Sequence, residues 1–510
     1  MNSQLAYSRP QKSVAGLGKL ARDPHRFLEK QVLLTGDAPH LATVNGRNTF
    51  LYSIRLLVRI CPNLTIMLPA ESGFLRSEAE QISARIAFGK AVQFAEAELD
   101  IRSFDAILSV GNVVHPSLPW TAINSNGWVC RVSSGKTPLA TQSEMENPVG
   151  ALAAACLGTG EVFKRLIALD PNRGELLDGF AFSLRTFEIS PQDSGPALPA
   201  AIEVDLLVVG AGAIGNGIVA LLVDLPWCGS ISIVDRERYG DENLGTCILI
   251  GPDDITVPKA EVLEQCLLSA GKSAKGFDST FASYAAALGD RYPVLVLNGL
   301  DNIDVRHEVQ RSLWPDLIVD GAIGDFVCQV SRHPWGEDAA CLMCLFREPT
   351  RSSELDAIEA TGLSHARIGQ PDSVVTSDDV AAAPNHMKEY LETHLGKRVC
   401  SVVSAAVTQK ISREEQARGF EPSVPFVAVF SACMVVAEAI AKVTGWPSVL
   451  SSRFQFDFLQ GPGRGQMYPQ ARRGDCLCAR TRNIERVRGS HGLGGSSLLV
   501  TARSFSAQQS

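Results

Sequence analysis

The chain has 510 residues, which is too long for one ordinary domain and predicts two or three. Hydrophobic residues make up 45% of it and charged residues 20%, a balance that is typical of a soluble globular protein. The formal net charge of −8 disfavours a dedicated nucleic-acid binder.

The apolar and cysteine content predicts a cytoplasmic protein. Residues 1–20 are polar and mixed, without the apolar run of a secretory signal. The most apolar long stretch, 426–443, carries Glu438, so we expect a buried helix there and no membrane span. The thirteen cysteines are an odd number spread along the chain, which indicates reduced thiols rather than a disulfide framework.

Apolar strand-like runs alternate with helical patterns along the first half of the chain. The strand-like runs are 31–35, 64–68, 106–110 and 127–132, and the helical patterns are 48–60, 78–88 and 148–169. Alternation of this kind predicts an α/β fold with a parallel sheet. The first domain is therefore expected over residues 1–189.

The same alternation restarts after residues 190–202, a linker rich in Pro, Gly and Ser. Strands are predicted at 205–209, 230–234, 294–297 and 317–319, and a helix at 215–225. This repetition indicates one α/β fold used twice.

The second domain is expected in two pieces, residues 203–349 and 425–480. The polar, helix-biased residues 350–424 separate these pieces and are interpreted as an insertion. Residues 481–510 form the last part of the chain, and since Gly and Ser are abundant from Gly489 onward, they are expected to be disordered.

A glycine-rich turn follows the first strand of the second domain. The run Gly210-Ala-Gly212-Ala-Ile-Gly215 comes directly before a helix, so phosphate groups can approach the backbone at the helix N-terminus. Asp235 lies 20 residues after Gly215, at the end of the next strand, where a carboxylate meets ribose hydroxyls. These features alone predict an adenosine nucleotide, most commonly NAD.

Further polar residues and two cysteine pairs follow the glycine turn. In chain order they are Glu237, Asn243 with Leu244, Lys259 after Pro258, Asp301 with Asn302, Cys341 with Cys344, and Cys476 with Cys478. In this combination the chain resembles the ubiquitin-activating superfamily, which includes the ThiF and MoeB type adenylyltransferases. It resembles most closely the activating enzymes of bacterial ubiquitin-like conjugation operons. The resemblance covers roughly residues 205–478, over half the chain.

The resemblance implies two Rossmann-like adenylation domains, of which the first is inactive because it lacks the glycine turn. One chain would then be a pseudo-dimer, or would pair with a second copy as a homodimer. The implied activity is ATP-dependent adenylation of the C-terminal carboxylate of a ubiquitin-like protein. The product would pass to a conjugating enzyme. An unrelated N-terminal α/β domain is the alternative for the first half.

The resemblance also implies roles for the polar residues. Lys259 would stabilise charge on the α-phosphate of ATP, Asp301 would hold Mg²⁺, Asp235 and Glu237 would bind the ribose, and Asn243 would lie near the phosphates. Simpler alternatives exist for three of them. Asp301 could cap the following helix, Lys259 could be a solvated surface residue, and Asp235 could close a turn.

One position departs from the family pattern. The family carries an arginine three residues after the Asn of Asn243-Leu244, and here that residue is Thr246. Arg9, in a short Tyr-Ser-Arg segment, resembles an arginine that related enzymes bring in from the partner domain. Arg236 and Arg238 are local alternatives. Without such a cation, adenylation would be slow or lost.

The four cysteines of the two pairs predict a structural metal site. Four thiolates bind Zn²⁺ tetrahedrally in closed structural sites, and the family places zinc at these two points of the chain. The second pair, Cys476 and Cys478, has a shorter spacing than the usual C-x-x-C. The alternative is packed or redox-active thiols.

Cys400 is the candidate nucleophile. It follows Lys397 and Arg398, and neighbouring cations favour a thiolate. It lies in the insertion, where activating enzymes of this family carry their catalytic cysteine, so the resemblance implies a thioester on Cys400. A half-buried cysteine on a helix is the alternative, and Cys433 is expected to be a core residue.

Two other functions remain open. An NAD-dependent oxidoreductase would leave the cysteine pairs and the Lys259–Asp301 combination unexplained. A non-catalytic scaffold that binds a ubiquitin-like protein would accommodate Thr246. The sequence shows no rhodanese-like extension, which favours conjugation over sulfur transfer.

Overall fold

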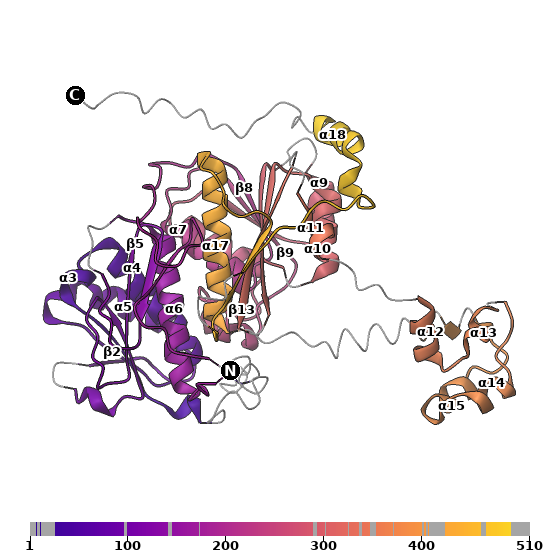
Figure 1. Ribbon diagram of the computed structural model, residues 1–510, viewed down its shortest axis with the longest axis horizontal. Coiled ribbons are helices and arrows are strands. Elements are labelled where there is room, and N and C mark those ends of the chain that lie inside the picture. Colours follow the sequence, from indigo (N-terminus) through magenta and orange to yellow (C-terminus); the bar gives the residue numbers. More distant parts are fainter. Residues whose placement is uncertain are drawn as a thin grey trace. The chain divides into compact units, whose positions relative to one another are not determined.

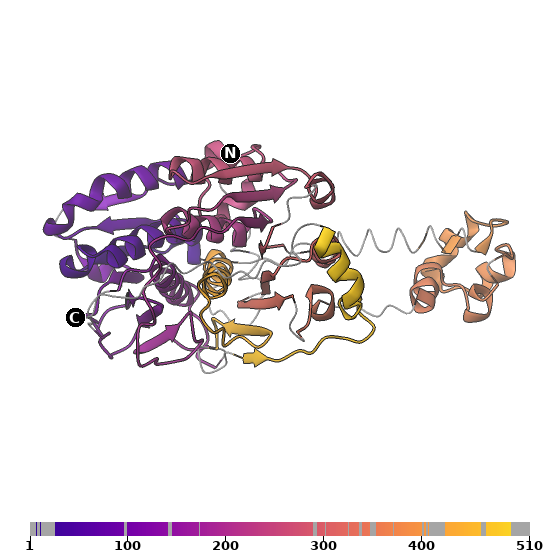
Figure 2. The same cartoon turned by 90° about the horizontal axis from the view of Figure 1, so that it is seen from above.

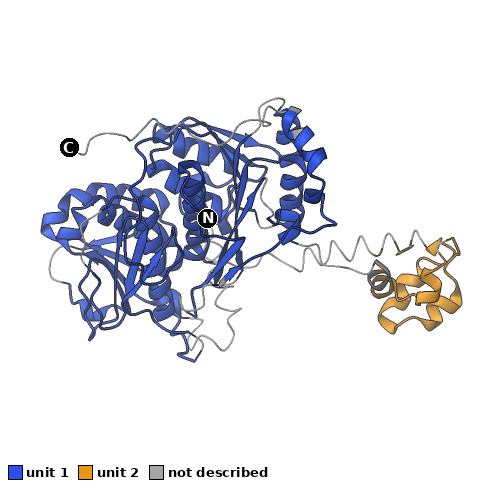
Figure 3. Ribbon diagram, turned by 45° about the horizontal axis from the view of Figure 1, so that its top comes forward, with its two compact units in different colours: residues 1–346, 422–510 blue, residues 347–421 orange. Residues whose placement is uncertain are grey.

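The structure of the protein is a computed structural model. It describes residues 7, 11, 26–95, 99–140, 145–172, 174–288, 293–300, 302–324, 326–335, 339–346, 353–370, 372–399, 402–403, 406, 424–460 and 466–490. The chain divides into two compact units, one of residues 1–346 and 422–510 and one of residues 347–421 (Figure 3).

The first half of the chain forms a seven-stranded sheet in the order β3-β2-β1-β4-β5-β6-β7. The strands are β1 Val32–Gly36, β2 Leu64–Met67, β3 Gln93–Ala95, β4 Ala106–Val110, β5 Trp120–Asn126, β6 Val129–Ser133 and β7 Phe180–Ser183. The helices are η2 Phe27–Glu29, α3 Ala38–Leu41, α4 Val44–Ile60, η3 Ala70–Leu75, α5 Arg76–Ile86, η4 Ile101–Ser103 and α6 Pro148–Leu166.

The second half forms an eight-stranded sheet in the order β10-β9-β8-β11-β12-β13-β14-β15. The strands are β8 Leu206–Val209, β9 Ile231–Asp235, β10 Ala274–Asp278, β11 Leu295–Asn298, β12 Leu317–Gly324, β13 Val327–Pro334, β14 Arg453–Asp457 and β15 Gln466–Tyr468. The helices are α7 Ala213–Asp224, η5 Asp241–Gly245, η6 Pro252–Asp254, α8 Lys259–Ser269, α9 Phe281–Ala287, α10 Ile303–Ser312, α11 Leu342–Leu345, α17 Pro425–Thr444, η8 Leu477–Ala479 and α18 Thr481–Ser490.

The two sheets repeat one strand order, so the expectation of one α/β fold used twice is confirmed. In each half the third strand in chain order forms one edge, and the first strand lies between the second and the fourth. Long helices also recur at equivalent places, since α6 follows β6 and α17 follows β13. The two halves are thus both Rossmann-like.

The expected parallel pairing is present from β1 to β5 and from β8 to β12, and each sheet continues with antiparallel strands. Strands β5 to β7 and β12 to β15 pair antiparallel. The link between β5 and β6 is only residues 127–128, and a link of this length can join only antiparallel strands. Gly127, with φ of +55°, makes the turn without strain.

A layer of four helices lies between the two sheets and contains the core. Helix α4 packs on α6, α7 packs on α17, and α6 packs on α17 (Figures 1 and 2). Their buried side chains and the inner faces of both sheets form one continuous hydrophobic cluster. The two halves therefore cover each other's apolar surface.

Helix α17 is the apolar helix that the sequence predicts. Pro425 occupies its first turn, and Gly445 ends it with a φ of +71°. It is the one described helix with the length and apolar composition to cross a bilayer. Because 94% of its apolar window is buried inside the protein, it is a core helix, as expected.

Residues 347–421 form a small helical unit of their own. Its helices are α12 Ser353–Thr361, α13 His365–Ile368, α14 Ser377–Ala382 and α15 Asn385–Glu392. Leu363, Val375, Leu391 and Val399 belong to its separate hydrophobic core. Cys400 lies outside the described residues.

The expectation of disorder is wrong for residues 481–490. Residues 481–490 form α18, because Ile484 is buried and the Arg488 guanidinium donates to the Trp314 carbonyl and pairs with Asp316. The helix was not predicted from the sequence because the segment is highly charged and has few apolar residues. Residues 491–510 lie outside the described part of the chain.

The close packing of α7 on α17 yields a prediction about stability. A Cβ atom at Gly217 would lie 2.6 Å from the Ala432 Cβ, closer than two carbon atoms approach. We expect Gly217→Val to separate the helices and destabilise the protein by about 1–3 kcal/mol, measured as a lower midpoint of thermal unfolding. Gly73→Val is the control, since a Cβ there meets nothing within 4 Å. Equal midpoints for the two variants would contradict this packing.

Candidate functional site

The glycine turn lies at the point where the strand order of the second sheet reverses. Strand β8 pairs with β9 on one side and β11 on the other, which is where open α/β sheets bind ligands. Gly210 has a φ of +91°, a conformation that favours glycine. At Gly215 a Cβ would lie 2.1 Å from the Gly210 carbonyl oxygen, so only glycine fits there.

Gly212 leaves the N-terminus of α7 open. A Cβ at Gly212 would meet nothing within 4 Å, and no side chain caps the helix that begins at Ala213. The N-cap residue therefore offers no side-chain acceptor to the first main-chain N–H groups of α7. Such a helix end attracts phosphate by its dipole and its donors.

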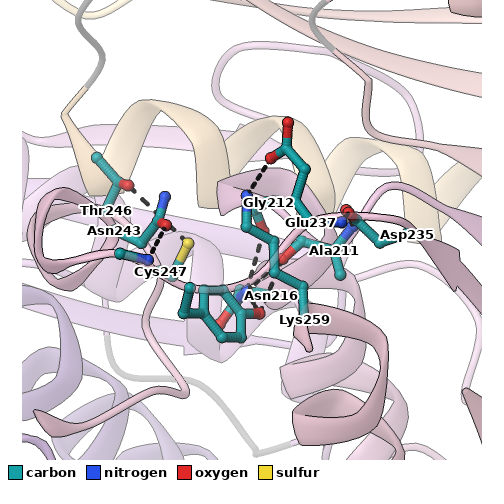
Figure 4. Close-up of polar contacts among 11 residues, drawn as sticks. Ala211, Gly212, Asn216, Asp235, Glu237, Asn243, Thr246, Cys247 and Lys259 are labelled. Carbon is teal, nitrogen blue, oxygen red and sulfur yellow. Dashed lines mark hydrogen bonds and ion pairs between the residues drawn. The ribbon is translucent and has the colours of Figure 1, made fainter. Parts of the chain in front are cut away.

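Asp235 ties the glycine turn to the next loop. Its Oδ2 accepts a hydrogen bond of 2.7 Å from the Ala211 N–H, and its Oδ1 accepts one of 2.8 Å from the Glu237 N–H (Figure 4). Burial raises the pKa of Asp235, although these two donors and the Lys259 charge act against it. Asp235 therefore closes a turn, as the simpler alternative predicts, and the same carboxylate also positions the glycine turn.

Lys259 is a buried cation and not a solvated surface residue. It is the first residue of α8 and is only 6% exposed. Its Nζ lies 2.6 Å from Glu237 Oε2, and its N–H donates to the Glu237 carbonyl over 2.8 Å. Burial alone lowers the pKa of Lys259, but the Glu237 hydrogen bond and nearby negative charges outweigh it, so the pKa is raised. The ammonium group is therefore charged.

Asn243 shapes the loop that follows. Its Oδ1 accepts from the Gly240 N–H over 2.8 Å, and its carbonyl accepts from the N–H groups of Thr246 and Cys247. These bonds close the short helix η5. Thr246, at the position of the family's arginine, is fully buried and carries no charge.

Asn216 and Tyr239 also hold the glycine turn, and sequence reasoning missed both. The Asn216 amide donates to the carbonyls of Ala211 and Gly212 over 3.1 and 3.0 Å and to the Tyr239 hydroxyl over 2.9 Å. The Tyr239 hydroxyl donates to the Ala211 carbonyl over 2.8 Å. The sequence signal that could have found Asn216 is an amide side chain within the otherwise apolar run of α7, since a buried amide needs hydrogen-bond partners.

Asp301 lies outside the described residues, but its neighbour decides one alternative. Asn302 Oδ1 accepts from the N–H groups of Asp304 and Val305 at the start of α10. Asn302 is therefore the cap of that helix, and the alternative that Asp301 caps it is wrong.

The candidate arginines are placed unevenly. Arg9 lies outside the described residues, although Tyr7, two residues before it, is buried against Phe88. Arg236 is exposed. Arg238 is also exposed and donates to the Thr256 carbonyl over 2.9 Å.

The four predicted metal cysteines come together. Their Sγ atoms all lie within 4.8 Å of one another, and all four residues are buried. Three pairs are 3.8, 3.6 and 3.5 Å apart. Zinc–sulfur bonds of about 2.3 Å in a tetrahedron separate sulfurs by about 3.8 Å, so the cluster fits a tetrahedral ion. Cys433, in contrast, is fully buried in α17, as a core residue.

Three comparisons relate the chain to known proteins. The model of the ThiF family matches residues 199–478. The chain is 26% identical over 495 residues to the uncharacterized protein y4jF of Sinorhizobium fredii, covering 91% of this chain and 92% of that protein.

Solved structures of Escherichia coli MccB are also similar to the chain. The structure of MccB with MccA matches with a TM-score of 0.36 and 13% identity, over 55% of this chain and 67% of MccB. The structure of MccB with ATP matches with a TM-score of 0.36 and 12% identity, over 55% and 68% of the two chains. Because the ThiF model matches more than half of the chain, the chain belongs to the ThiF family, within the superfamily of ThiF and MoeB type adenylyltransferases.

Proposed function

We propose that the chain activates the C-terminal carboxylate of a ubiquitin-like protein by ATP-dependent adenylation in its second half. The observation that carries the proposal is the buried ammonium of Lys259. It pairs with Glu237, which is bound through its N–H to the same Asp235 carboxylate that holds the glycine turn at the open N-terminus of α7. Membership of the ThiF family supports it. The fold alone would support only nucleotide binding.

In this reaction a carboxylate oxygen of the carrier attacks the α-phosphorus of ATP. A new oxygen–phosphorus bond forms, the bond to the leaving oxygen breaks, and pyrophosphate departs. Negative charge accumulates on the α-phosphate, and a preorganised cation stabilises it. Lys259 is suited to this role because burial and the loop around Glu237 hold its ammonium group in place.

The remaining residues have supporting roles in the proposal. Asp235 binds the ribose, and Asn243 lies near the phosphates. Glu237 both aims Lys259 and, being largely exposed, reaches the ribose side. Asp301 holds Mg²⁺, a hard cation that prefers carboxylate oxygen. Zn²⁺ in the four-cysteine cluster fastens the end of the domain to α11.

The first half is inferred to be inactive. After β1, the place of the glycine turn is taken by Asp37, whose Oδ1 accepts from the His40 N–H over 3.1 Å and pairs with the imidazole at 2.6 Å. Its Oδ2 lies 2.1 Å from where a Cβ of Gly111 would be. A carboxylate at this strand end repels phosphate, so this half serves as the partner domain.

The proposal extends to transfer through the unit of residues 347–421. Cys400 would attack the acyl-adenylate, its sulfur would form a thioester with the carrier, and AMP would leave. A conjugating enzyme would then receive the carrier. The scaffold alternative is favoured by one observation, the buried and uncharged Thr246. The NAD alternative is weaker, because it uses neither Lys259 nor the cysteine cluster.

Removal of the Lys259 charge tests adenylation. We expect Lys259→Met to lower ATP–pyrophosphate exchange, driven by a candidate ubiquitin-like carrier protein, by about a hundredfold or more. Lys275→Met is the matched control, since the Lys275 side chain is 67% exposed. Carrier binding without exchange in the wild type would support the scaffold. Unchanged exchange in Lys259→Met would remove Lys259 from the reaction.

The metal site predicts one zinc ion per chain, measured by mass spectrometry of the purified protein. We expect Cys341→Ser to lose the zinc and to lower the thermal midpoint, because the tail around η8 is then released from α11. Cys228→Ser, at an exposed cysteine, should keep the metal. A wild type without zinc would contradict the assignment.

The thioester step predicts a carrier adduct that thiols reverse. We expect Cys400→Ala to lose this adduct on denaturing gels and to keep pyrophosphate exchange, since adenylation precedes transfer. Cys228→Ala should keep both. An adduct that survives Cys400→Ala would rule out the nucleophile.

A further inference from the structure

Arg59, in α4 of the first half, reaches into the second half. Its side chain is fully buried. Nη1 donates to the Leu244 carbonyl over 2.8 Å, and Nη2 donates to the Ile250 carbonyl over 2.6 Å. One guanidinium therefore binds both ends of the loop 244–250, which contains Thr246.

Burial of the charged Arg59 side chain opposes folding. Its Cζ lies 5.4 Å from the centre of the Phe88 ring. Its Nε has no hydrogen-bond partner among the residues that the structure describes, and the Asp254 carboxylate is the weakest of the charges that act on the guanidinium. Burial lowers the pKa of Arg59 to about 10, so it remains charged at neutral pH. Removal of this charge from water opposes folding, and the two hydrogen bonds to the loop offset that cost, which points to a role for the two donors in holding the loop.

The loop that Arg59 binds is connected to the glycine turn. The loop begins beside Asn243 and closes on α7, where the Leu249 N–H donates to Asn216 Oδ1 over 3.2 Å. The Asn216 amide in turn donates to the carbonyl of Gly212. A displacement of the loop would thus break the hydrogen bond between Leu249 and Asn216, the residue that holds the glycine turn.

We propose that Arg59 is a positioning residue for ATP, supplied by the inactive half of the chain. It holds the loop 244–250, and through Asn216 the glycine turn, in the arrangement that binds the nucleotide. It does not touch the nucleotide. The inference rests on the proposed function, since it requires that the second half binds ATP. It gives the first half a role in the site.

The test compares ATP affinity with stability in the full chain. ATP binding by calorimetry and the thermal midpoint are measured for the wild type, Arg59→Met, Arg59→Lys and Arg55→Met. Arg55 is the control because it lies one turn earlier on α4 and interacts with Asp224, at the far end of α7 from the glycine turn. All variants keep the residues proposed to contact ATP.

We expect Arg59→Met to weaken ATP binding about tenfold or more, since small misplacements of a site have effects of this size. Arg55→Met should keep wild-type affinity at a similar loss of midpoint. Arg59→Lys keeps the charge but cannot reach both carbonyls, so its affinity should be intermediate. It also provides the test if Arg59→Met does not fold.

Two outcomes would overturn the proposal. In one, the Arg59 variants bind ATP as the wild type does. In the other, the Arg59 and Arg55 variants lose affinity equally and in step with stability, as a purely architectural arginine would. A wild type that binds no ATP would instead overturn the proposed function, so the two failures are distinguishable.

Discussion

Each half of the chain has an apolar sheet face whose exposure to water would be unfavourable. The four helices between the sheets cover both of these faces. Helices α6 and α17 are each apolar on several sides because each packs on a sheet and on other helices. This shared core fixes the two halves against each other. Other features of the site follow from it.

The arrangement of the site depends on that core through α7. The helix is held against α17 at Gly217, so its N-terminus and the glycine turn cannot shift freely. Asn216, on the same helix, donates to the Ala211 carbonyl of the turn, while Asp235, at the end of β9, accepts from the Ala211 N–H. Helix α4 packs in the same layer and carries Arg59 to the loop after Asn243. One half of a duplicated fold can thus hold a loop of the other half in place.

Much of this could be predicted from local sequence patterns. Gly210, Gly212, Gly215 and Asp235 lie within one strand–turn–helix–strand unit, and their spacing already describes the turn. Helix α17 was recognisable by its long, predominantly apolar run. The cysteine cluster was predicted from two short motifs, although its members are far apart in the chain.

What could not be predicted depends on contacts across the chain. Arg59 looks like any helix arginine until its partners, 185 and 191 residues away, are known. The burial of Lys259 and the neutral interior position of Thr246 are likewise tertiary properties. The antiparallel pairing was not predicted because the expected strand 127–132 covered the turn at residues 127–128 and β5 was not expected. The short link between β5 and β6 was therefore not apparent. Asp301 and Cys400 remain predictions, since both lie outside the described residues.

The central claim is that the second half transfers the adenylyl group of ATP to a carboxylate. The most direct measurement incubates the chain and the ubiquitin-like protein with ATP labelled at either the α- or the γ-phosphate and follows the label on the carrier. The account predicts acid-stable label on the carrier only from the α-phosphate, and none when the carrier's last residue is removed. Label on the carrier from the γ-phosphate would contradict the account. Label from the α-phosphate that persists after removal of the carrier's last residue would also contradict it.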